Sequence, residues 1–283
     1  MTATLFIVAT PIGNLQDMSQ RAISTLQNVS LVALEDTRQG MKLWSRFGID
    51  TKMQILNKDN EHKVIDKILV VLGGGQDVAL ISDAGTPLIH DPGSMLVSRV
   101  ESGGFKVAPV PGACALIAAL SVAGFDVSRF VFCGFLPTKK SLLATEIDRL
   151  ESEVKPMVFY EAPHRIVKTI TSLAKAFGEQ REAVLARELT KIHEEIVRKS
   201  LGEMLVMMAS GEIMIKGEMV LIVAGVEVVA VEPDTSFSLN LNDLLAESLK
   251  YLSVKDAAKM AASLSDMSHT KVYQACLKLK NKD

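Results

Sequence analysis

Three ionisable residues lie together in the segment ALEDTRQG (residues 33–40), directly after a short apolar run. Glu35 and Asp36 supply carboxylates that could accept a proton, and Arg38 supplies a cation that could hold an anion. Charged groups at the end of a strand usually either form an ion pair where a helix begins or face a cleft. Because three such groups converge here, the pattern favours the cleft.

A second pattern, FYEAPHR (residues 159–165), combines a phenol, a carboxylate, an imidazole and a guanidinium. Pro163 suits the first position of a helix, so Glu161 could equally be a capping group and His164 a solvated side chain. Taken alone, this segment supports the structural and the chemical interpretation about equally.

The densest cluster of charge is ARELTKIHEE (residues 186–195), which predicts a strand, a turn and a second strand. Its ionisable side chains are Arg187, Glu188, Lys191, His193, Glu194 and Glu195. Successive residues of a strand point to opposite faces of a sheet, so some of these charges must be ordinary surface groups. The others are candidates for a site.

Three further segments are rich in glycine, proline or small residues: TPIGNLQDMS (residues 10–19), ISDAGTPLIHDPG (residues 81–93) and VPGACALIAAL (residues 110–120). Like residues 33–40, each follows or completes an apolar run. This places all four at the carboxyl edge of one parallel sheet, where ligands of open α/β folds bind. Four irregular loops that meet at one edge are better explained by a binding cleft than by four independent turns.

Several familiar chemistries lack their signatures. The loops contain neither a G-x-G-x-x-G nor a Walker sequence, and the chain has no G-x-S-x-G elbow. The five histidines show no spacing typical of metal ligands, so no metal site is expected. The three cysteines lie far apart, which predicts buried or inert thiols in a reducing cytosol.

Apolar runs alternate with helical patterns in the first part of the chain, which predicts repeated βαβ units and a mostly parallel, helix-covered sheet. The expected strands are residues 5–9, 31–34, 52–56, 78–81 and 106–110. The expected helices are residues 19–27, 41–47, 61–72, 92–101 and 113–123.

The sequence pattern changes near Gly124, and a second α/β region is expected after it. Its expected strands are residues 130–135, 157–160, 183–186, 192–199 and 219–223, and its expected helices are residues 141–151, 165–176 and 201–208. After a polar linker (residues 233–240), a unit that resembles a small helix-turn-helix is expected, with helices at residues 241–252, 254–264 and 270–279. The predicted domains are therefore residues 1–123, 124–232 and 240–283.

Composition sets further limits. A net charge of −2 gives no overall signature of nucleic-acid binding, although a local basic patch would be hidden in the sum. From residue 250 onward, seven lysines accompany three aspartates, and this excess favours a contact to RNA phosphates over a solvated helical cap. No apolar stretch reaches the about 20 residues that span a bilayer, and the N-terminus lacks a basic signal region. A soluble, cytoplasmic protein is expected.

Six motifs, in this order along the chain, resemble those of the ribosomal RNA small subunit methyltransferase I family. They are VATPIGNLQDMSQRAISTL, EDTR, LISDAGTPLIHDPG, FYEAPHR, ARELTKIHEE and KGEMVLIVAG, and the likeness covers residues 5 to about 225. That family is of the tetrapyrrole-methylase type and methylates the ribose 2'-hydroxyl of a decoding-centre cytidine in 16S rRNA.

The resemblance implies an α/β fold in which two domains of tetrapyrrole-methylase type enclose a cofactor cleft, followed by a small helical unit. It implies S-adenosyl-L-methionine as cofactor, 16S rRNA in the small ribosomal subunit as substrate, and a homodimer, with no metal and no membrane. Carried over position by position, it implies the cofactor-binding residues Pro11, Ser82, Asp83, Ala84, Gly85, Thr86, Ile89, Cys114, Ala115, Tyr160, Glu161 and Leu189. The strand after Lys216-Gly217-Glu218 is expected to close the adenine pocket.

Methyl transfer from a sulfonium to a weakly acidic ribose hydroxyl depends on alignment, and is helped by a base or a cation near the hydroxyl. The candidate catalytic residues are Asp36, Glu161, His164, Glu188 and Lys191. Glu161 and Lys191 are favoured because their motifs are densest in ionisable groups.

The chain departs from the family pattern at three places. Cys114 stands where a serine is common, which leaves backbone contacts to the cofactor; Lys58 stands where a histidine is common, which argues against a catalytic histidine there. The pair Gln39-Gly40 is expected to alter a local RNA contact. Two alternatives stay open: a small-molecule tetrapyrrole methylase, and a noncatalytic RNA-binding protein of ribosome assembly that retains the cleft. The motifs EDTR, EAPHR and RELTKIHEE and the helical tail favour the rRNA enzyme.

Overall fold

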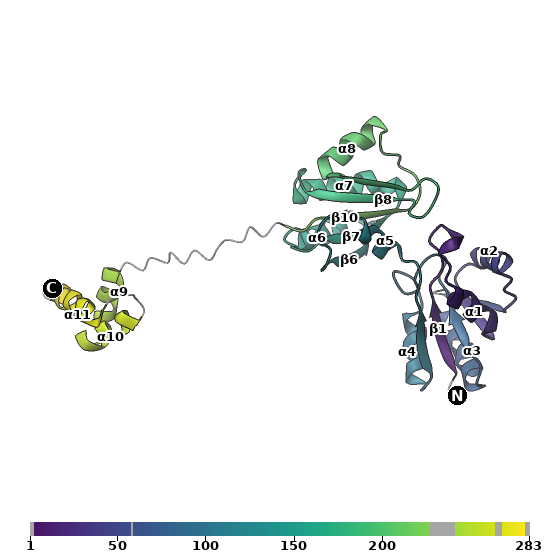
Figure 1. The fold of residues 1–283 in the computed structure, drawn as a ribbon, viewed down its shortest axis with the longest axis horizontal. Helices are drawn as coiled ribbons and strands as arrows, with labels where there is room; N and C mark the ends of the chain where they lie inside the picture. Colours follow the sequence, from purple (N-terminus) through teal and green to yellow (C-terminus); the bar gives the residue numbers. More distant parts are fainter. Residues whose placement is uncertain (1–2, 58, 227–240, 264–267, 281–283) are drawn as a thin grey trace. The chain divides into compact units, whose positions relative to one another are not determined.

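The computed structural model describes residues 3–57, 59–226, 241–263 and 268–280 (Figure 1). By its internal contacts the chain divides into two compact units, Met1–Glu227 and Val228–Asp283. Two five-stranded sheets with their helices build the first unit, and helices build the described part of the second. The predicted combination of α/β regions with a helical C-terminal part is confirmed.

The first sheet is parallel throughout, with the strand order β3-β2-β4-β1-β5. Its strands are β1 (Thr4–Val8), β2 (Leu31–Leu34), β3 (Met53–Ile55), β4 (Val78–Leu80) and β5 (Lys106–Val110). Each coincides with a predicted strand to within one residue at either end. Because the strands are parallel, the loops after β1, β2, β4 and β5 leave the same edge of the sheet, as predicted.

Helices cover both faces of this sheet (Figure 1). They are α1 (Gln20–Asn28), α2 (Thr37–Phe47), α3 (Glu61–Gly73) and α4 (Ser94–Ser102), with a short 3-10 helix η1 (Leu15–Asp17) after β1. α3 and α4 pack around Leu5 and Leu80 on one face, whereas α1 and α2 pack around Val8 and Ile81 on the other. The alternation of strands with amphipathic helices therefore gives a three-layer arrangement.

The second sheet is mixed, with the order β6-β7-β10-β8-β9. Its strands are β6 (Val131–Phe135), β7 (Met157–Glu161), β8 (Glu182–Arg187), β9 (Glu195–Ser200) and β10 (Met219–Val223). β6 and β7 are parallel, whereas β10 is antiparallel to both of its neighbours, β7 and β8. Although β10 comes last along the chain, it occupies the centre of the sheet, and all five of its residues are buried.

This sheet is also covered on both faces. Its helices are α5 (Ala115–Ser121), α6 (Lys140–Leu150), α7 (Pro163–Phe177) and α8 (Leu201–Ser210). α6, α7 and α8 share one apolar cluster with Phe159 and Leu221. α5 lies on the opposite face, where Leu116 and Leu120 pack with Val158 of β7. The helix that precedes the predicted boundary at residue 123 therefore contributes its apolar side to the second sheet.

One strand begins later than predicted. The spacing of apolar residues predicts a strand over residues 192–199, but β9 starts only at Glu195. The residues before it form a compact turn, in which the Lys191 N–H donates to the Glu188 carbonyl and the Glu194 N–H donates to the Lys191 carbonyl. Residues 192–194 therefore belong to the turn, and Ile192, which the pattern assigns to a strand, is 97% exposed.

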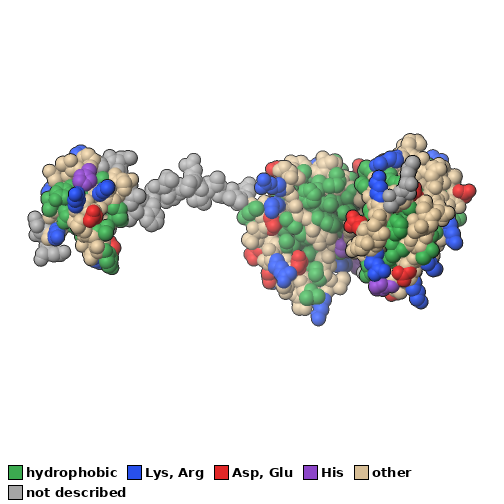
Figure 2. Space-filling view, turned by 90° about the horizontal axis from the view of Figure 1, so that it is seen from below, with side chains coloured by type: hydrophobic (Ala, Val, Ile, Leu, Met, Phe, Trp, Pro, Cys, Tyr) green, Lys and Arg blue, Asp and Glu red, His purple; other side chains and the backbone are tan. Residues whose placement is uncertain are grey.

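The second unit contains α9 (Leu241–Leu249), α10 (Val254–Ser263) and α11 (His269–Lys280), close to the predicted helices. Its small core joins Leu245, Ala257, Ala261, Val272 and Cys276. Figure 2 shows basic side chains beside acidic ones on the visible face of this unit. The predicted linker, residues 233–240, and part of the predicted turn between the last two helices lie outside the described residues. No helix in the described part of the chain is long and apolar enough to cross a membrane.

Candidate functional site

A cavity of about 380 Å³ lies where the carboxyl edge of the first sheet meets the second sheet. This volume is within the range of pockets for small ligands. The first part of the chain contributes Ile12, Asp83, Ala84, Gly85, Thr86, Ile89, His90, Asp91, Cys114 and Ala115. The second part contributes Phe135, Tyr160, Glu161, Ala162, Pro163, Ala186, Leu189, Gly217, Glu218, Met219 and Val220.

The predicted cofactor-binding residues meet at this cavity, with two exceptions. Pro11 and Ser82 are buried but do not line it. Ser82 instead supports the loop after β4, because its hydroxyl lies 3.3 Å from the carbonyl oxygens of both Ala84 and Gly85 and can donate its proton to either. The start of β10 also contributes to the wall, through Met219 and Val220 and through Gly217 and Glu218 just before the strand.

Gly85 joins two of the predicted loops. Its N–H donates to the Thr10 carbonyl at 3.1 Å, and its carbonyl accepts from the Thr10 N–H at 2.9 Å. Gly85 has a φ of +83°, which favours glycine, and a Cβ there would lie 3.2 Å from Cγ2 of Ile12. The loop after β4 is therefore fixed close against the loop after β1, and Gly85 forms part of the cavity wall.

Strained backbone is concentrated beside the cavity. In the described residues, the side-chain-bearing positions with positive φ are Leu88, His90, Glu188 and Thr190, with values between 51° and 73°. The first two lie in the loop after β4, and the other two flank the cavity residue Leu189. Such conformations cost about 1–3 kcal/mol each and cluster at functional sites. Their positions support a functional role for this cavity.

Two aspartates on the cavity wall have raised pKa values. Burial raises the pKa of Asp83, and a hydrogen bond from the Asp36 N–H at 3.2 Å offsets part of this effect. Burial also raises the pKa of Asp91, partly offset by a hydrogen bond with Ser82. A carboxylate whose pKa is raised is a stronger proton acceptor than an ordinary one.

Glu161 lines the cavity but is held by its own part of the chain. Its Oε1 accepts from the Ala162 N–H at 2.9 Å and lies 3.3 Å from Nε of Arg165. Its Oε2 accepts from the Thr169 hydroxyl at 2.6 Å. The side chain is fully buried, so these partners satisfy both carboxylate oxygens. This arrangement suits a residue that fixes the junction of β7 and α7.

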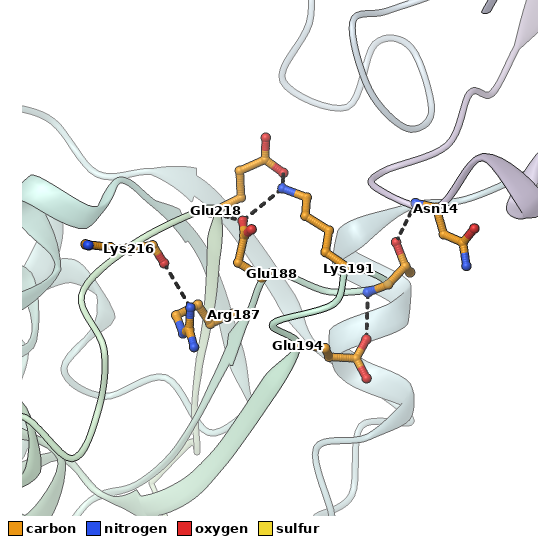
Figure 3. Close-up of polar contacts among 8 residues, drawn as sticks. Asn14, Arg187, Glu188, Lys191, Glu194, Lys216 and Glu218 are labelled. Carbon is orange, nitrogen blue, oxygen red and sulfur yellow. Dashed lines mark hydrogen bonds and ion pairs between the residues drawn. The ribbon is translucent and has the colours of Figure 1, made fainter. Parts of the chain in front are cut away.

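Lys191 is the centre of an ion-pair cluster (Figure 3). Its Nζ lies 2.8 Å from Oε1 of Glu188 and 3.1 Å from Oε2 of Glu218, and Oε1 of Glu188 also accepts from the Glu218 N–H at 2.9 Å. Burial alone would lower the pKa of Lys191, but the hydrogen bonds with both glutamates outweigh it and the pKa is raised. The Lys191 hydrogen bond lowers the pKa of Glu188. Lys191 therefore remains a cation at neutral pH.

The same cluster joins the two halves of the cavity. The Asn14 N–H, in the loop after β1, donates to the Thr190 hydroxyl at 3.1 Å (Figure 3). The neighbouring Gly13 lies so close that a Cβ there would be 2.5 Å from Cγ of Lys191. The turn before β9 is therefore positioned by the first sheet as well as by the second.

The remaining predicted catalytic residues lie outside the cavity wall. Asp36 caps α2 and pairs with Arg38 at 2.6 Å, and this hydrogen bond lowers the pKa of Asp36. His164 is exposed at the start of α7, one residue beyond the cavity residue Pro163. Of the five candidates, the structure brings Glu161 to the wall, with Lys191 and Glu188 adjoining it through Glu218. Lys58 is outside the described residues.

Comparison with known proteins identifies the family. Residues 4–205 match the family described as Tetrapyrrole (Corrin/Porphyrin) Methylases. The protein of Pseudomonas aeruginosa named Ribosomal RNA small subunit methyltransferase I is 44% identical over 279 residues, which cover 99% of this chain and 98% of the relative. The chain belongs to the ribosomal RNA small subunit methyltransferase I family. The family member from Escherichia coli O157:H7 is 41% identical over 273 residues, with 96% and 94% covered.

Solved structures of other methyltransferases share the fold of this chain. The cobalamin biosynthetic enzyme cobalt precorrin-4 methyltransferase matches with a TM-score of 0.59 at 14% identity, covering 78% of this chain and 94% of that one. A uroporphyrin-III C-methyl transferase from Thermus thermophilus, complexed with S-adenyl homocysteine, matches with a TM-score of 0.55 at 15% identity, covering 78% and 97%. The predicted tetrapyrrole-methylase fold is confirmed.

Several residues of the cavity wall were not predicted from the sequence. His90 and Asp91 belong to the quoted loop after β4, so their ionisable side chains were a usable signal. Phe135 carries no such signal, because it is one apolar residue at the end of a strand. Ala186 and Val220 line the cavity only because β8 and β10 lie side by side, which their sequences do not reveal.

Proposed function

We propose that this chain transfers the methyl group of S-adenosyl-L-methionine to the ribose 2'-hydroxyl of a decoding-centre cytidine in 16S rRNA. The names of its relatives support a ribosomal RNA substrate, and the six sequence motifs support the cytidine ribose as the target. The enzyme acts on the small ribosomal subunit in the cytoplasm, as a homodimer.

The charge of the cavity wall is the observation that best supports S-adenosylmethionine as the cofactor. Among the described residues that line the cavity there are four carboxylates and neither a lysine nor an arginine. Glu161 and Glu218 are ion-paired with Arg165 and Lys191 beside the wall, so Asp83 and Asp91 supply its net negative charge. Such a wall suits a ligand with net positive charge, as S-adenosylmethionine has through its sulfonium and ammonium groups. The volume of about 380 Å³ and the position of Gly85 on the cavity wall, where no side chain intervenes, also fit this molecule.

When bound, S-adenosylmethionine supplies a methyl carbon that is electrophilic because its leaving group is a neutral thioether. The protein must align the ribose hydroxyl with that carbon and accept the proton that the hydroxyl loses. Glu161 has both oxygens occupied and Lys191 is protonated, so Asp83 and Asp91 fit the role of proton acceptor better. Glu161 and the Lys191 cluster hold the walls in place, and the cationic Lys191 adds a positive field near Glu218.

The helical tail, residues 240–283, is proposed as an RNA-contacting unit. Six of its described lysines are exposed beyond the end of α9: Lys250, Lys255, Lys259, Lys271, Lys278 and Lys280. Contacts to phosphates strengthen binding without specifying sequence and weaken as salt rises. This unit would hold the ribosomal substrate while the cavity acts on one nucleotide.

A methyl-transfer assay with tritiated S-adenosylmethionine tests the proposal. Small ribosomal subunits, naked 16S rRNA and uroporphyrinogen are offered side by side, and the modified ribose is mapped by primer extension. Label on a cytidine ribose of the small subunit supports the proposal. Label on uroporphyrinogen alone would instead identify a small-molecule methylase, and RNA binding without label would identify a noncatalytic protein. Light scattering that returns the single-chain mass of 30.7 kDa would refute the homodimer.

A further inference from the structure

We propose that His90 and Phe135 form a stacking platform for an unpaired nucleobase of the RNA substrate, at the edge of the cavity. This inference rests on the proposed function and adds to it the contact that holds the target nucleotide. His90 lies in the predicted loop of residues 81–93 but was not among the predicted site residues, and Phe135 lies outside the loops that the sequence motifs selected.

The platform is a contact between rings from distant parts of the chain. The ring centroids of His90 and Phe135 lie 4.8 Å apart, with 53° between the ring planes. Behind Phe135, the Tyr160 ring lies 5.8 Å away, and Phe132 packs edge-on to Tyr160 at 5.1 Å. Aromatic pairs at these separations are attractive. The platform is therefore supported from below by a continuous aromatic cluster.

Both platform residues are open to solvent. Phe135 is 42% exposed although it ends a strand whose other side chains pack inward, and His90 is exposed as well. Both line the cavity. The two rings contact each other on the wall of a cavity rather than lying singly on the open surface, so they offer a flat ligand a joint aromatic surface.

Two departures from regular backbone bring the rings together. His90 has a φ of +73°, and a β-bulge between Phe132 and Gly134 shifts the register of β6 just before Phe135. Gly134 has a φ of +61°, and a Cβ there would lie 2.9 Å from Nδ1 of His90. Bulges re-aim side chains beside active sites. The glycine therefore lets the imidazole lie against β6 and gives the next residue its outward direction.

The chemistry of the wall points to a nucleobase. Among the described residues of the wall there is no lysine or arginine that could pair directly with a phosphate or with a tetrapyrrole carboxylate. A neutral, flat group can approach it. Proteins recognise unpaired RNA bases by stacking them on aromatic and histidine side chains. A base resting on His90 and Phe135 would place its attached ribose toward the cavity.

The test uses the full chain with Phe135→Leu, which removes the ring but keeps apolar bulk, and Phe135→Tyr, which keeps the ring. Leu142→Ala, at an exposed apolar position on α6, is the matched control. A short single-stranded RNA that contains the fluorescent base pyrrolocytosine is added to protein saturated with S-adenosylhomocysteine. Stacking quenches the fluorescence, so we expect quenching by the wild type, Phe135→Tyr and Leu142→Ala, and its loss in Phe135→Leu.

Methylation of small subunits and calorimetry with S-adenosylmethionine complete the test. Phe135→Leu is expected to lower kcat/KM for subunits by roughly 5- to 150-fold, the range that one base stack corresponds to, while cofactor affinity stays within twofold. Unchanged quenching and kcat/KM in Phe135→Leu would overturn the platform. An equal loss of cofactor affinity would overturn it too, because the ring would then belong to the cofactor site. A wild type that quenches but methylates no subunit would overturn the proposed function and leave the platform standing.

Discussion

Gly217→Ala should lower the free energy of unfolding in two ways: it strains the backbone, and it displaces the side chain of Glu188. Gly217 has a φ of +81°, and a Cβ built there overlaps Cγ, Cδ and Oε1 of Glu188. The carboxylate would have to move, which breaks its contacts with Lys191 Nζ at 2.8 Å and the Glu218 N–H at 2.9 Å. The strain of a left-handed alanine is therefore only one part of the cost.

Gly211 provides a control for the backbone strain of a left-handed alanine. Gly211, at the end of α8, has a φ of +82° and nothing within 4 Å of a built Cβ. Gly211→Ala should therefore cost only the conformational term, about 1–2 kcal/mol. Gly217→Ala should cost the same amount plus about 1.5–3 kcal/mol for the hydrogen bonds of a partly buried carboxylate. The two variants should differ by about 2 kcal/mol in free energy of unfolding.

Urea unfolding followed by circular dichroism measures this difference, and calorimetry measures the affinity for S-adenosylmethionine. In a Glu188→Ala background the overlap disappears, so Gly217→Ala should then cost no more than Gly211→Ala. Cofactor affinity should fall in Gly217→Ala, whose residue lines the cavity, and stay unchanged in Gly211→Ala. Equal costs for the two single variants, or no relief in the Glu188→Ala background, would refute the reasoning.

Three further outcomes are expected. Gly85→Val should weaken S-adenosylmethionine binding more than tenfold, about 1.4 kcal/mol, whereas Gly75→Val, with a similar φ in open space, should not; equal affinities in calorimetry would reject the pocket. Because the pKa of Glu188 is lowered in the folded state, its stabilising effect is fully present above the unfolded value of about 4.3 and is lost as pH falls through the folded pKa. The stability gap between the wild type and Glu188→Gln should therefore be constant from neutral pH to about 5 and shrink below it; a gap independent of pH would contradict this. Lys255→Gln with Lys259→Gln should lower methylation of subunits and reduce its salt dependence, with cofactor affinity unchanged; full activity at low and physiological salt would argue against a phosphate contact.

The first sheet could be predicted nearly in full because its signals are local. Each parallel strand is a short apolar run that ends in glycine, proline or charge, and the helices between them are amphipathic. The start of α2 was misjudged by four residues because its cap, Asp36, was given a role in a cleft instead. The same carboxylate therefore had two chemically reasonable interpretations that only the hydrogen bond to Arg38 N separates.

The site could be predicted only where its residues are neighbours in the sequence. The loop after β4 contributes neighbouring wall residues, and the motifs located it. The partners of Lys191 were harder to predict, since Glu218 reaches it only through the pairing of β10 with β8. Phe135 was missed because a bulge, not its residue type, turns it toward the cavity. Long-range pairing and local irregularity leave no periodic trace in a sequence.

The central position of β10 has a consequence for synthesis on the ribosome. β7 and β8 pair with β6 and β9 respectively, and each keeps an unpaired edge until β10 is available. From the end of β8 to the end of β10 the ribosome needs roughly 2 to 7 seconds. During that interval two apolar strand edges are open to other nascent chains, which is the situation in which edge strands aggregate. A chain that ends before Met219 would also lack part of the cavity wall, so ligand binding can protect the protein only once β10 has joined the sheet.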